Sequence, residues 1–336
     1  ARVSDLLAIA EQRQGKQARG SIGYAIEQFE QSTEYAGLSG STRTDYSYCA
    51  GIVRTFKTQL GCTLDTLQVD RLTTPTIQRL VEVIAKGKGD VPPRPSKANH
   101  LLRFLRRLFA WSIRFGHCKT NPAEGVKEAR ERKQFRMPAH DAYALALNFA
   151  RERGARKPHT KGSCPPYLWR VMEIAYLCRM RGLEVIRLTD AHATDDGLRV
   201  SRVKGSLNNI VKWNPRLRAA WDSACTVRAE ILLKRSRPVQ IRPEKRFLFV
   251  DESGVPLKKN ALNKAWQSLM HAVIEANVIT ENQRFTLHGL KHRGITDTKG
   301  HRGVKKEASG HKTDAMLDVY DHDIPLVEPA SAPEIK

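Results

Sequence analysis

The apolar side chains of residues 21–127 recur at helical spacing almost throughout, and this pattern restricts the possible folds more than any other feature of the sequence. It breaks only at 37–40, Gly61 and 87–95, where glycine and proline are typical of turns. We therefore expect an all-helical first half. From His140 onwards short apolar runs of strand length are mixed with the helical pattern, so the second half is expected to be α+β.

The secondary structure of several segments in the second half can be predicted from the sequence. Residues 198–204 and 209–213 favour the two strands of a hairpin. Residues 247–250 form a short apolar run and are expected to be a further strand. The helical pattern resumes over residues 259–276.

A dense run of charged residues followed by Pro138 indicates a linker between the two halves. Such a joint would let two domains close around an elongated partner. The expected parts are a loose basic arm (1–20), a helical domain (21–127), a linker (128–138), an α+β domain (139–322) and a tail (323–336).

The chain is strongly basic, with 57 Lys and Arg against 35 Asp and Glu, a formal charge of +22 and a pI near 10.0. Such a charge attracts polyanions, which include nucleic acids and anionic membrane surfaces. No apolar run approaches the roughly 20 residues that span a bilayer, and no signal-peptide pattern is present, so we expect a cytoplasmic protein without a membrane partner. The six cysteines form no Cys-x-x-Cys pair, which disfavours disulfides and cysteine zinc sites.

Two predicted helices carry a basic stripe. The helix expected from Ser96 to Phe115 and the helix expected from Thr42 to Leu60 each place several basic residues on one side, at steps of about 100° per residue. Each stripe alone fits a solvated surface, but two in one domain favour a DNA backbone, because the planar guanidinium pairs with phosphate through two hydrogen bonds. The candidate DNA-binding residues are Arg43, Arg54, Lys57, Arg103, Arg106, Arg107 and Arg114.

Four short motifs follow one another in the second half. The first two are Arg-Gly-Leu-Glu at residues 181–184 and a Lys-Gly pair at 204–205, within the expected hairpin. The third is His-Gly-Leu-Lys at residues 288–291. The last is the Gly-His pair at 310–311, followed nine residues later by Tyr320. Each motif alone is weak, and their order carries the information.

With these motifs the sequence resembles the tyrosine recombinase, or phage integrase, family, in which an arginine, a hairpin lysine, a His-x-x-Arg segment, a Gly-His pair and a tyrosine occur in this order. The resemblance covers residues 140–322, and the helical first half resembles the family's core-type DNA-binding domain. It implies a site-specific recombinase that cleaves and rejoins DNA through a 3′-phosphotyrosyl intermediate. It also implies double-stranded recombination sites as substrate, a tetramer on paired sites, DNA-bending accessory proteins, and action at the nucleoid of a bacterial host, in a phage or prophage context.

The resemblance assigns roles to single residues. Tyr320 is the expected nucleophile. Arg181, Lys291 and His311 are expected to hold the scissile phosphate and stabilise the charge of the transition state. Lys204 is the expected general acid for the departing 5′ oxygen.

Two more residues complete the expected site. His288 is expected to hydrogen-bond the phosphate or accept the tyrosine proton, and Glu184 to orient the motif arginine as a structural support. Arg202 and Lys212 lie on the same hairpin as Lys204 and remain alternatives for the general acid. Because the phosphotyrosyl bond keeps the energy of the broken bond, the resemblance implies no metal, ATP or other cofactor.

The sequence departs from the family at Lys291, where arginine is usual. Lysine keeps the positive charge but lacks the planar fork of arginine. We expect an active enzyme with an altered phosphate clamp; Arg293 would point about 200° away on the same helix. A non-catalytic DNA-binding descendant of the family and an enzyme like the type IB topoisomerases remain alternatives.

A metal-dependent nuclease is a further alternative. His288 and His292 are four residues apart, so a helix would place them on one face, and His301, His311 and His322 follow in the sequence. However, no glutamate follows His288 as in a His-Glu-x-x-His motif. We therefore expect no metal site.

Overall fold

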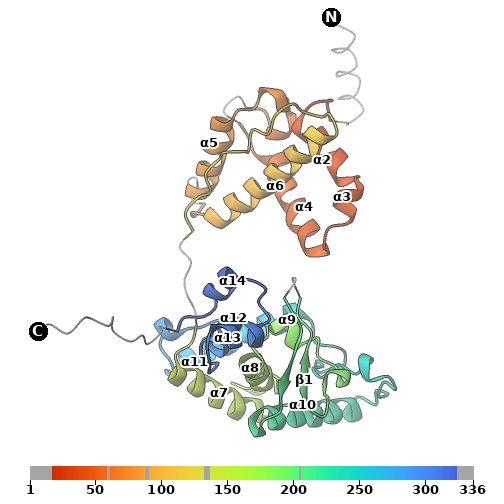
Figure 1. The fold of residues 1–336 in the computed structure, drawn as a ribbon, viewed down its shortest axis with the longest axis vertical. Helices are drawn as coiled ribbons and strands as arrows, with labels where there is room; N and C mark the ends of the chain where they lie inside the picture. The colour runs from red at the N-terminus through yellow and green to blue at the C-terminus, as the bar shows by residue number, and fades with distance from the viewer. Residues whose placement is uncertain (1–16, 59–60, 88–90, 132–136, 204–205, 324–336) are drawn as a thin grey trace, which may run out of the picture. The chain divides into compact units, whose positions relative to one another are not determined.

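The chain divides into two compact units between Lys133 and Gln134, within the stretch predicted as a linker. The first unit is helical, and the second is mainly helical with one two-stranded sheet (Figure 1). The computed structural model describes residues 17–58, 61–87, 91–131, 137–203 and 206–323.

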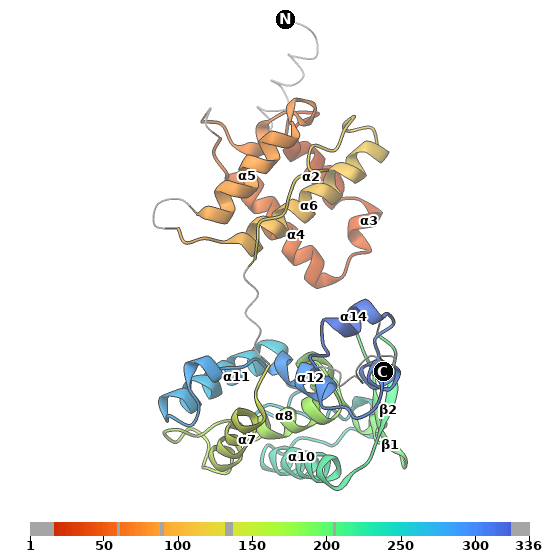
Figure 2. The same ribbon diagram turned by 60° about the vertical axis from the view of Figure 1, so that its left-hand side comes forward.

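The first unit is built around its longest helix, which packs against three others (Figures 1 and 2). Phe29, Phe104 and Phe109 are among the side chains fully buried in its core. Its elements are α2 (Ile22–Glu30), α3 (Thr33–Ala36), α4 (Gly40–Thr55), α5 (Thr74–Lys86) and α6 (Pro95–Arg114), with 3₁₀ turns at Leu64–Thr66 and Val69–Arg71.

Two expected helix boundaries in this unit need correction. The helix predicted over Thr42–Leu60 ends at Thr55, because the backbone becomes extended at Phe56, where φ is −73° and ψ is 115°. Lys57 instead forms an isolated bridge with Thr63, so it does not share a helical stripe with Arg43 and Arg54. The helix predicted from Ser96 begins at Pro95, whose ring favours the first helical turn.

Residues at the start of the predicted linker lie against α6. Asn99 donates to the Ala129 carbonyl at 2.9 Å and accepts from the Ala129 N–H at 2.8 Å. Val126 is buried in the core of the same unit. This part of the chain is therefore packed as an extension of the helical unit.

The second unit surrounds the buried helix α8, which contacts α7, α10 and α12 (Figure 2). The hairpin predicted from the sequence is confirmed, with Gly197 opposite Lys212 and Val200 opposite Asn209. The elements are α7 (His140–Gly154), α8 (Leu168–Leu177), α9 (Gly182–Val185), β1 (Gly197–Val200), β2 (Asn209–Lys212), α10 (Pro215–Lys234), α11 (Lys259–Glu275), α12 (Leu287–Thr296), α13 (Arg302–Ser309) and α14 (Asp314–Asp318), with 3₁₀ turns at Asp190–His192, Pro243–Lys245 and Glu281–Gln283.

The helix expected over residues 259–276 is confirmed as α11, but the strand expected over residues 247–250 is wrong. Phe247 and Val250 each form only an isolated bridge, to Thr189 and Pro256. The apolar run is buried because it packs against the core and not because it joins a sheet. Within the described residues, no helix has the length and apolar character needed to cross a bilayer.

Gly310, which ends α13, is hydrogen-bonded to Leu207 in the loop between β1 and β2. Its φ of 71° is left-handed, and its carbonyl accepts from the Leu207 N–H at 2.8 Å. A Cβ at this position would lie 2.3 Å from the Leu207 carbonyl oxygen. The glycine of the Gly-His motif is therefore required both by its backbone conformation and by the close approach of the hairpin.

We predict that Gly310→Ala lowers the free energy of unfolding of the second unit by about 1–3 kcal/mol, because it adds a steric clash to left-handed strain. Denaturant unfolding of the full chain measures the loss. Gly116→Ala is the matched control, since Gly116 has a φ of 70° but open space around its Cβ direction. An equal loss in both variants would show that the hairpin contact contributes nothing.

Candidate active site

Arg181 precedes α9 and is held by Glu184, one turn further on. The Arg181 N–H donates to Glu184 Oε2 at 2.7 Å, and Nη1 donates to Oε1 at 2.9 Å. Burial opposes ionisation of Glu184, but the hydrogen bonds from Arg181 and the charge of Lys291 bring its pKa below the usual value. The guanidinium is thus fixed at one edge, and its Nη2 lies 3.4 Å from the Tyr320 hydroxyl.

Tyr320 lies in the turn that follows α14 and is only 7% exposed. Its N–H donates to the Leu317 carbonyl at 2.8 Å, which closes the turn. Its ring forms a small apolar cluster with Leu317 and with Ile295 of α12, separate from the main core. The turn therefore directs the hydroxyl inward, towards Arg181.

Three histidine rings surround the Tyr320 ring. His292 stacks on it with ring centroids 4.4 Å apart, and His311 lies at 4.6 Å in a tilted arrangement. His288 approaches edge-on at 5.6 Å and is itself exposed. Together these imidazoles confine the ring while the hydroxyl stays beside Arg181.

Lys291 is fully buried on α12, with Nζ 5.2 Å from the centre of the Tyr320 ring. Burial, together with the charges of Arg202 and Arg181, lowers the pKa of Lys291 to about 7. No hydrogen-bond acceptor among the described residues reaches its Nζ. A buried amine without an acceptor can donate hydrogen bonds to a bound anion.

His311 is also buried and directed by its neighbour. Its Nδ1 lies 3.1 Å from Ser309 Oγ, and the Ser309 hydroxyl donates to the Lys306 carbonyl at 3.0 Å. Ser309 Oγ then accepts from Nδ1–H, which places the lone pair of neutral His311 on Nε2. Burial and the charge of Lys291 lower the pKa of His311 to about 4, and its Nε2 has no partner among the described residues.

Of the three hairpin residues considered as general acid, Lys204 lies outside the described residues. Arg202 is committed elsewhere, since its guanidinium donates to the carbonyls of Cys178, Arg179 and Ala308. Lys212 is exposed opposite Gly197, at the end of the strand ladder farthest from the turn. Arg202 therefore anchors the hairpin and has no free fork for catalysis.

The predicted catalytic residues Arg181, His288, Lys291 and His311 thus come together around the side chain of Tyr320. Arg293, the possible substitute for Lys291, instead pairs with Asp297 of its own helix. The position of His292 against Tyr320 and the contact of Ser309 with His311 were not predicted from the sequence. The four-residue spacing from His288 did indicate that His292 shares its helix face.

The histidines do not combine into a metal centre. His292 Nδ1 lies 3.1 Å from His322 Nε2, and the two rings stack. Burial and the neighbouring His288 lower the pKa of His292 to about 3. Within the part of the chain that the structure describes, no group of three or more His, Cys, Asp or Glu side chains is arranged to hold a metal ion.

The basic residues of the first unit have more acidic partners than the sequence suggested. Glu128 pairs with Arg103 and Arg106, and Glu34 pairs with Arg107 and Arg114. Glu30 likewise pairs with Arg54. Across the described residues, Arg43 and Lys57 are exposed and have no ion pair. The basic stripes expected from the sequence are therefore partly neutralised by acids that are distant in the sequence.

Comparison with solved structures places this fold among DNA integrases. The chain is similar to a lambda integrase dimer bound to a COC′ core site, with 17% identity and a TM-score of 0.67 over 94% of this chain and 81% of that one. It is also similar to the Tn1549 transposon integrase in complex with circular intermediate DNA, with 14% identity and a TM-score of 0.68 over 91% and 96%. A lambda integrase tetramer bound to a Holliday junction matches with 17% identity and a TM-score of 0.64 over 88% and 78%.

The chain therefore has the fold of these tyrosine recombinases, and the resemblance found in the sequence is confirmed at the level of fold. No family model and no curated protein sequence matches the chain.

We predict that Lys291→Met stabilises the second unit at and below neutral pH. The pKa of Lys291 is lowered to about 7 in the folded state. Between pH 7 and the higher pKa of lysine in the unfolded chain, the unfolded state therefore binds one more proton than the folded state. The wild-type stability should therefore rise by up to about 1.4 kcal/mol per pH unit above pH 7, and the advantage of the variant should shrink accordingly.

Denaturant unfolding at pH 6 and pH 9 measures this difference. Lys312→Met removes the charge of an exposed lysine and is the control, expected to change stability equally at both pH values. Parallel stability profiles for wild type and Lys291→Met would contradict the prediction.

Proposed function

We propose that this chain is a site-specific DNA recombinase that cleaves and rejoins DNA through a phosphotyrosyl bond at Tyr320. The observation that carries the proposal is the cluster of cationic and imidazole groups around the Tyr320 side chain. Arg181 Nη2 lies 3.4 Å from the Tyr320 hydroxyl, and the buried Lys291 amine, 5.2 Å from the centre of the ring, has no acceptor among the described residues. Such a cluster suits a phosphodiester, which brings anionic oxygens to unsatisfied donors.

In the proposed reaction the Tyr320 oxygen attacks the phosphorus of the scissile phosphodiester. The new bond joins phosphorus to tyrosine on the 3′ side, and the bond to the 5′ oxygen breaks. Arg181 and Lys291 stabilise the charge that develops on the non-bridging oxygens. A 5′ hydroxyl from a partner strand reverses the step with no net change in bond type, so no external energy source is consumed.

Proton transfers accompany both bond changes. The Tyr320 proton is accepted by the exposed His288 or by neutral His311, whose lone pair lies on Nε2. The bound phosphate also favours the imidazolium form of His311, which then donates to it. Lys204 is proposed as the general acid for the 5′ oxygen; its neighbours Val203 and Leu207 donate to Glu184 and Gly310.

The proposed substrate is a pair of double-stranded recombination sites, bound by a tetramer with the help of DNA-bending proteins. The similar lambda integrase structures include a dimer on a core site and a tetramer on a Holliday junction. A chain with a charge of +22 suits such a polyanion. We place the activity at the nucleoid of a bacterial host, in the integration or excision of a phage-like element.

We predict that the wild-type chain forms a denaturant-resistant adduct with a nicked suicide substrate that carries its recombination site. Tyr320→Phe should form none, because it lacks the nucleophilic oxygen. Gel electrophoresis under denaturing conditions detects the adduct. Tyr48→Phe, an exposed tyrosine of the first unit, is the matched control and should form the adduct normally.

The same experiment separates the other candidates. Binding without any wild-type adduct would indicate a non-catalytic DNA-binding protein. An adduct accompanied by relaxation of supercoiled DNA, but not by strand exchange between sites, would indicate chemistry like that of the type IB topoisomerases. An adduct that persists in Tyr320→Phe would sink the assignment of the nucleophile.

We predict that Arg43→Ala weakens DNA binding more than Arg107→Ala. Arg43 is exposed and without an ion pair among the described residues, whereas Arg107 already pairs with Glu34. Loss of one phosphate contact should reduce the slope of log affinity against log salt by about 1. Fluorescence anisotropy over a range of salt concentrations measures it, and a larger change in Arg107→Ala would refute the proposed role of Arg43.

A further inference from the structure

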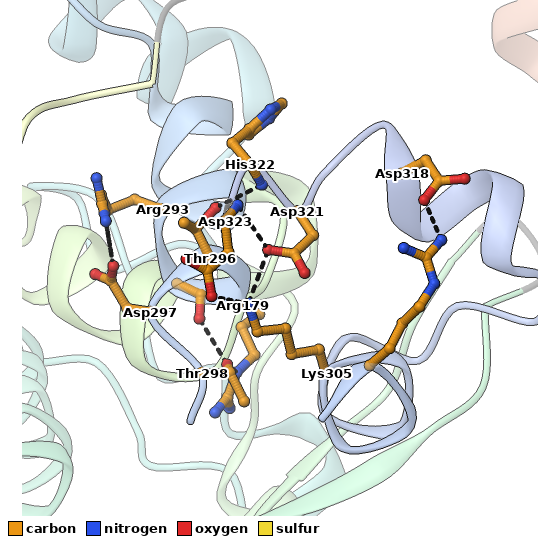
Figure 3. A network of polar contacts seen from close by, with 12 residues as sticks. Arg179, Arg293, Thr296, Asp297, Thr298, Lys305, Asp318, Asp321, His322 and Asp323 are labelled. Atoms are coloured by element: carbon orange, nitrogen blue, oxygen red, sulfur yellow. Dashed lines mark hydrogen bonds and ion pairs between the residues drawn. The ribbon is translucent and has the colours of Figure 1, made fainter. Parts of the chain in front are cut away.

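The helix α13 and the tyrosine-bearing segment, residues 314–323, have opposite charges where they meet. Arg302 pairs with Asp318, and Lys306 Nζ lies 2.9 Å from Asp314 Oδ1. Lys305, between them, contacts the two acids on either side of His322 (Figure 3). Three basic residues of one helix thus pair with four acidic residues that flank Tyr320.

The pairs of Lys305 differ from the others in burial. Its Nζ donates to Asp321 Oδ1 at 3.0 Å and to Asp323 Oδ2 at 2.9 Å, and its side chain is only 4% exposed. The Arg302–Asp318 pair is about half exposed on both sides. Exposed pairs are screened by water and salt, whereas removing one partner of a buried pair leaves an uncompensated charge. Lys305 therefore makes the strongest of these contacts.

Apart from the packing around the Tyr320 ring, the tyrosine segment has little buried apolar surface. Its helix α14 has only five residues, too few to persist without tertiary contacts. Leu317 and Tyr320 are its buried apolar side chains, while Met316 and Val319 are about half exposed. Further along, the His322 N–H donates to Thr296 Oγ1 at 3.2 Å (Figure 3). The position of the segment thus depends to a large extent on its polar contacts.

We propose that Lys305 is a positioning residue whose buried amine, paired with Asp321 and Asp323, holds residues 314–323 against α13 and keeps the Tyr320 hydroxyl beside Arg181. Asp321 is the residue next to Tyr320, so a contact that fixes its carboxylate also fixes the turn that directs the tyrosine ring. The expected effect on catalysis rests on the proposed function, whereas the expected effect on the position of residues 314–323 does not. Lys305 touches neither the hydroxyl nor the residues around it that are proposed to bind phosphate.

The first experiment uses no DNA. Hydrogen exchange followed by mass spectrometry compares peptides covering residues 313–323 in the wild type, Lys305→Met and Lys306→Met. We expect about tenfold faster exchange of this segment in Lys305→Met, with the core helix α8 unchanged. Lys306→Met removes a charge that is 32% exposed and pairs with the exposed Asp314, so it should leave exchange near the wild-type rate. Equal protection of the segment in both variants would overturn the proposal.

The second experiment measures the rate of adduct formation on the suicide substrate at saturating DNA. Displacement of the nucleophile should slow this rate by about 10²-fold in Lys305→Met without changing DNA affinity. Lys305→Arg, which keeps the charge, should recover part of the loss. A purely structural defect would instead lower affinity and thermal stability together and would count against the proposal.

Asp323→Asn covers the case in which Lys305→Met does not fold. The Asp323 side chain is 60% exposed, so this change removes one acceptor of Lys305 without emptying a buried position. It should give an intermediate increase in exchange of residues 313–323, and no increase would overturn the proposal. If the wild type forms no adduct at all, the proposed function fails, while the exchange measurement still decides whether Lys305 holds the segment.

Discussion

Glu184 supports the candidate site with a fully buried carboxylate, and it joins the start of α9 to the hairpin segment of the second unit. It accepts from the backbone and guanidinium of Arg181, and from the N–H of Val203 on the hairpin. A buried carboxylate is stable only when its oxygens are satisfied by donors. The same contacts that satisfy Glu184 therefore orient Arg181 towards Tyr320 and hold the hairpin next to α9.

The positive charge gathered near Glu184 makes the site suited to an anion. Arg202 and Lys291 are buried, and the Arg181 side chain is only 15% exposed. Burial, together with the neighbouring positive charges, lowers the pKa values of Lys291 and His311. This arrangement costs folding free energy, which a bound phosphate would offset by supplying the missing charge and acceptors. Lys291, which stands where the family usually has arginine, is thus also the residue whose protonation depends most on whether an anion occupies the site.

The sequence patterns predicted the helices and the hairpin well, because apolar periodicity reports which face of an element is buried. They failed where local pattern and tertiary packing conflict. The run at 247–250 is apolar because it faces the core, yet it forms only isolated bridges, to Thr189 and Pro256, and no strand. Helix α4 ends at Thr55 although the helical spacing of apolar residues continues to Leu60. The ion pairs of the arginine stripes were not predicted, because Glu34 and Glu128 are distant from these arginines in the sequence.

By itself the sequence determined the order of the chemical groups, since Arg181, Lys291, His311 and Tyr320 can be recognised from short motifs and their spacing. Their convergence on the Tyr320 side chain was decided by the tertiary structure, because they come from four separate segments joined only by packing and hydrogen bonds. The same holds for Lys305, which no motif singles out, and for His292, whose spacing from His288 indicated a shared helix face but not its contact with Tyr320. Their positions follow from contacts between α12, α13 and the tyrosine segment, and such contacts depend on distances in space that residue spacing does not encode.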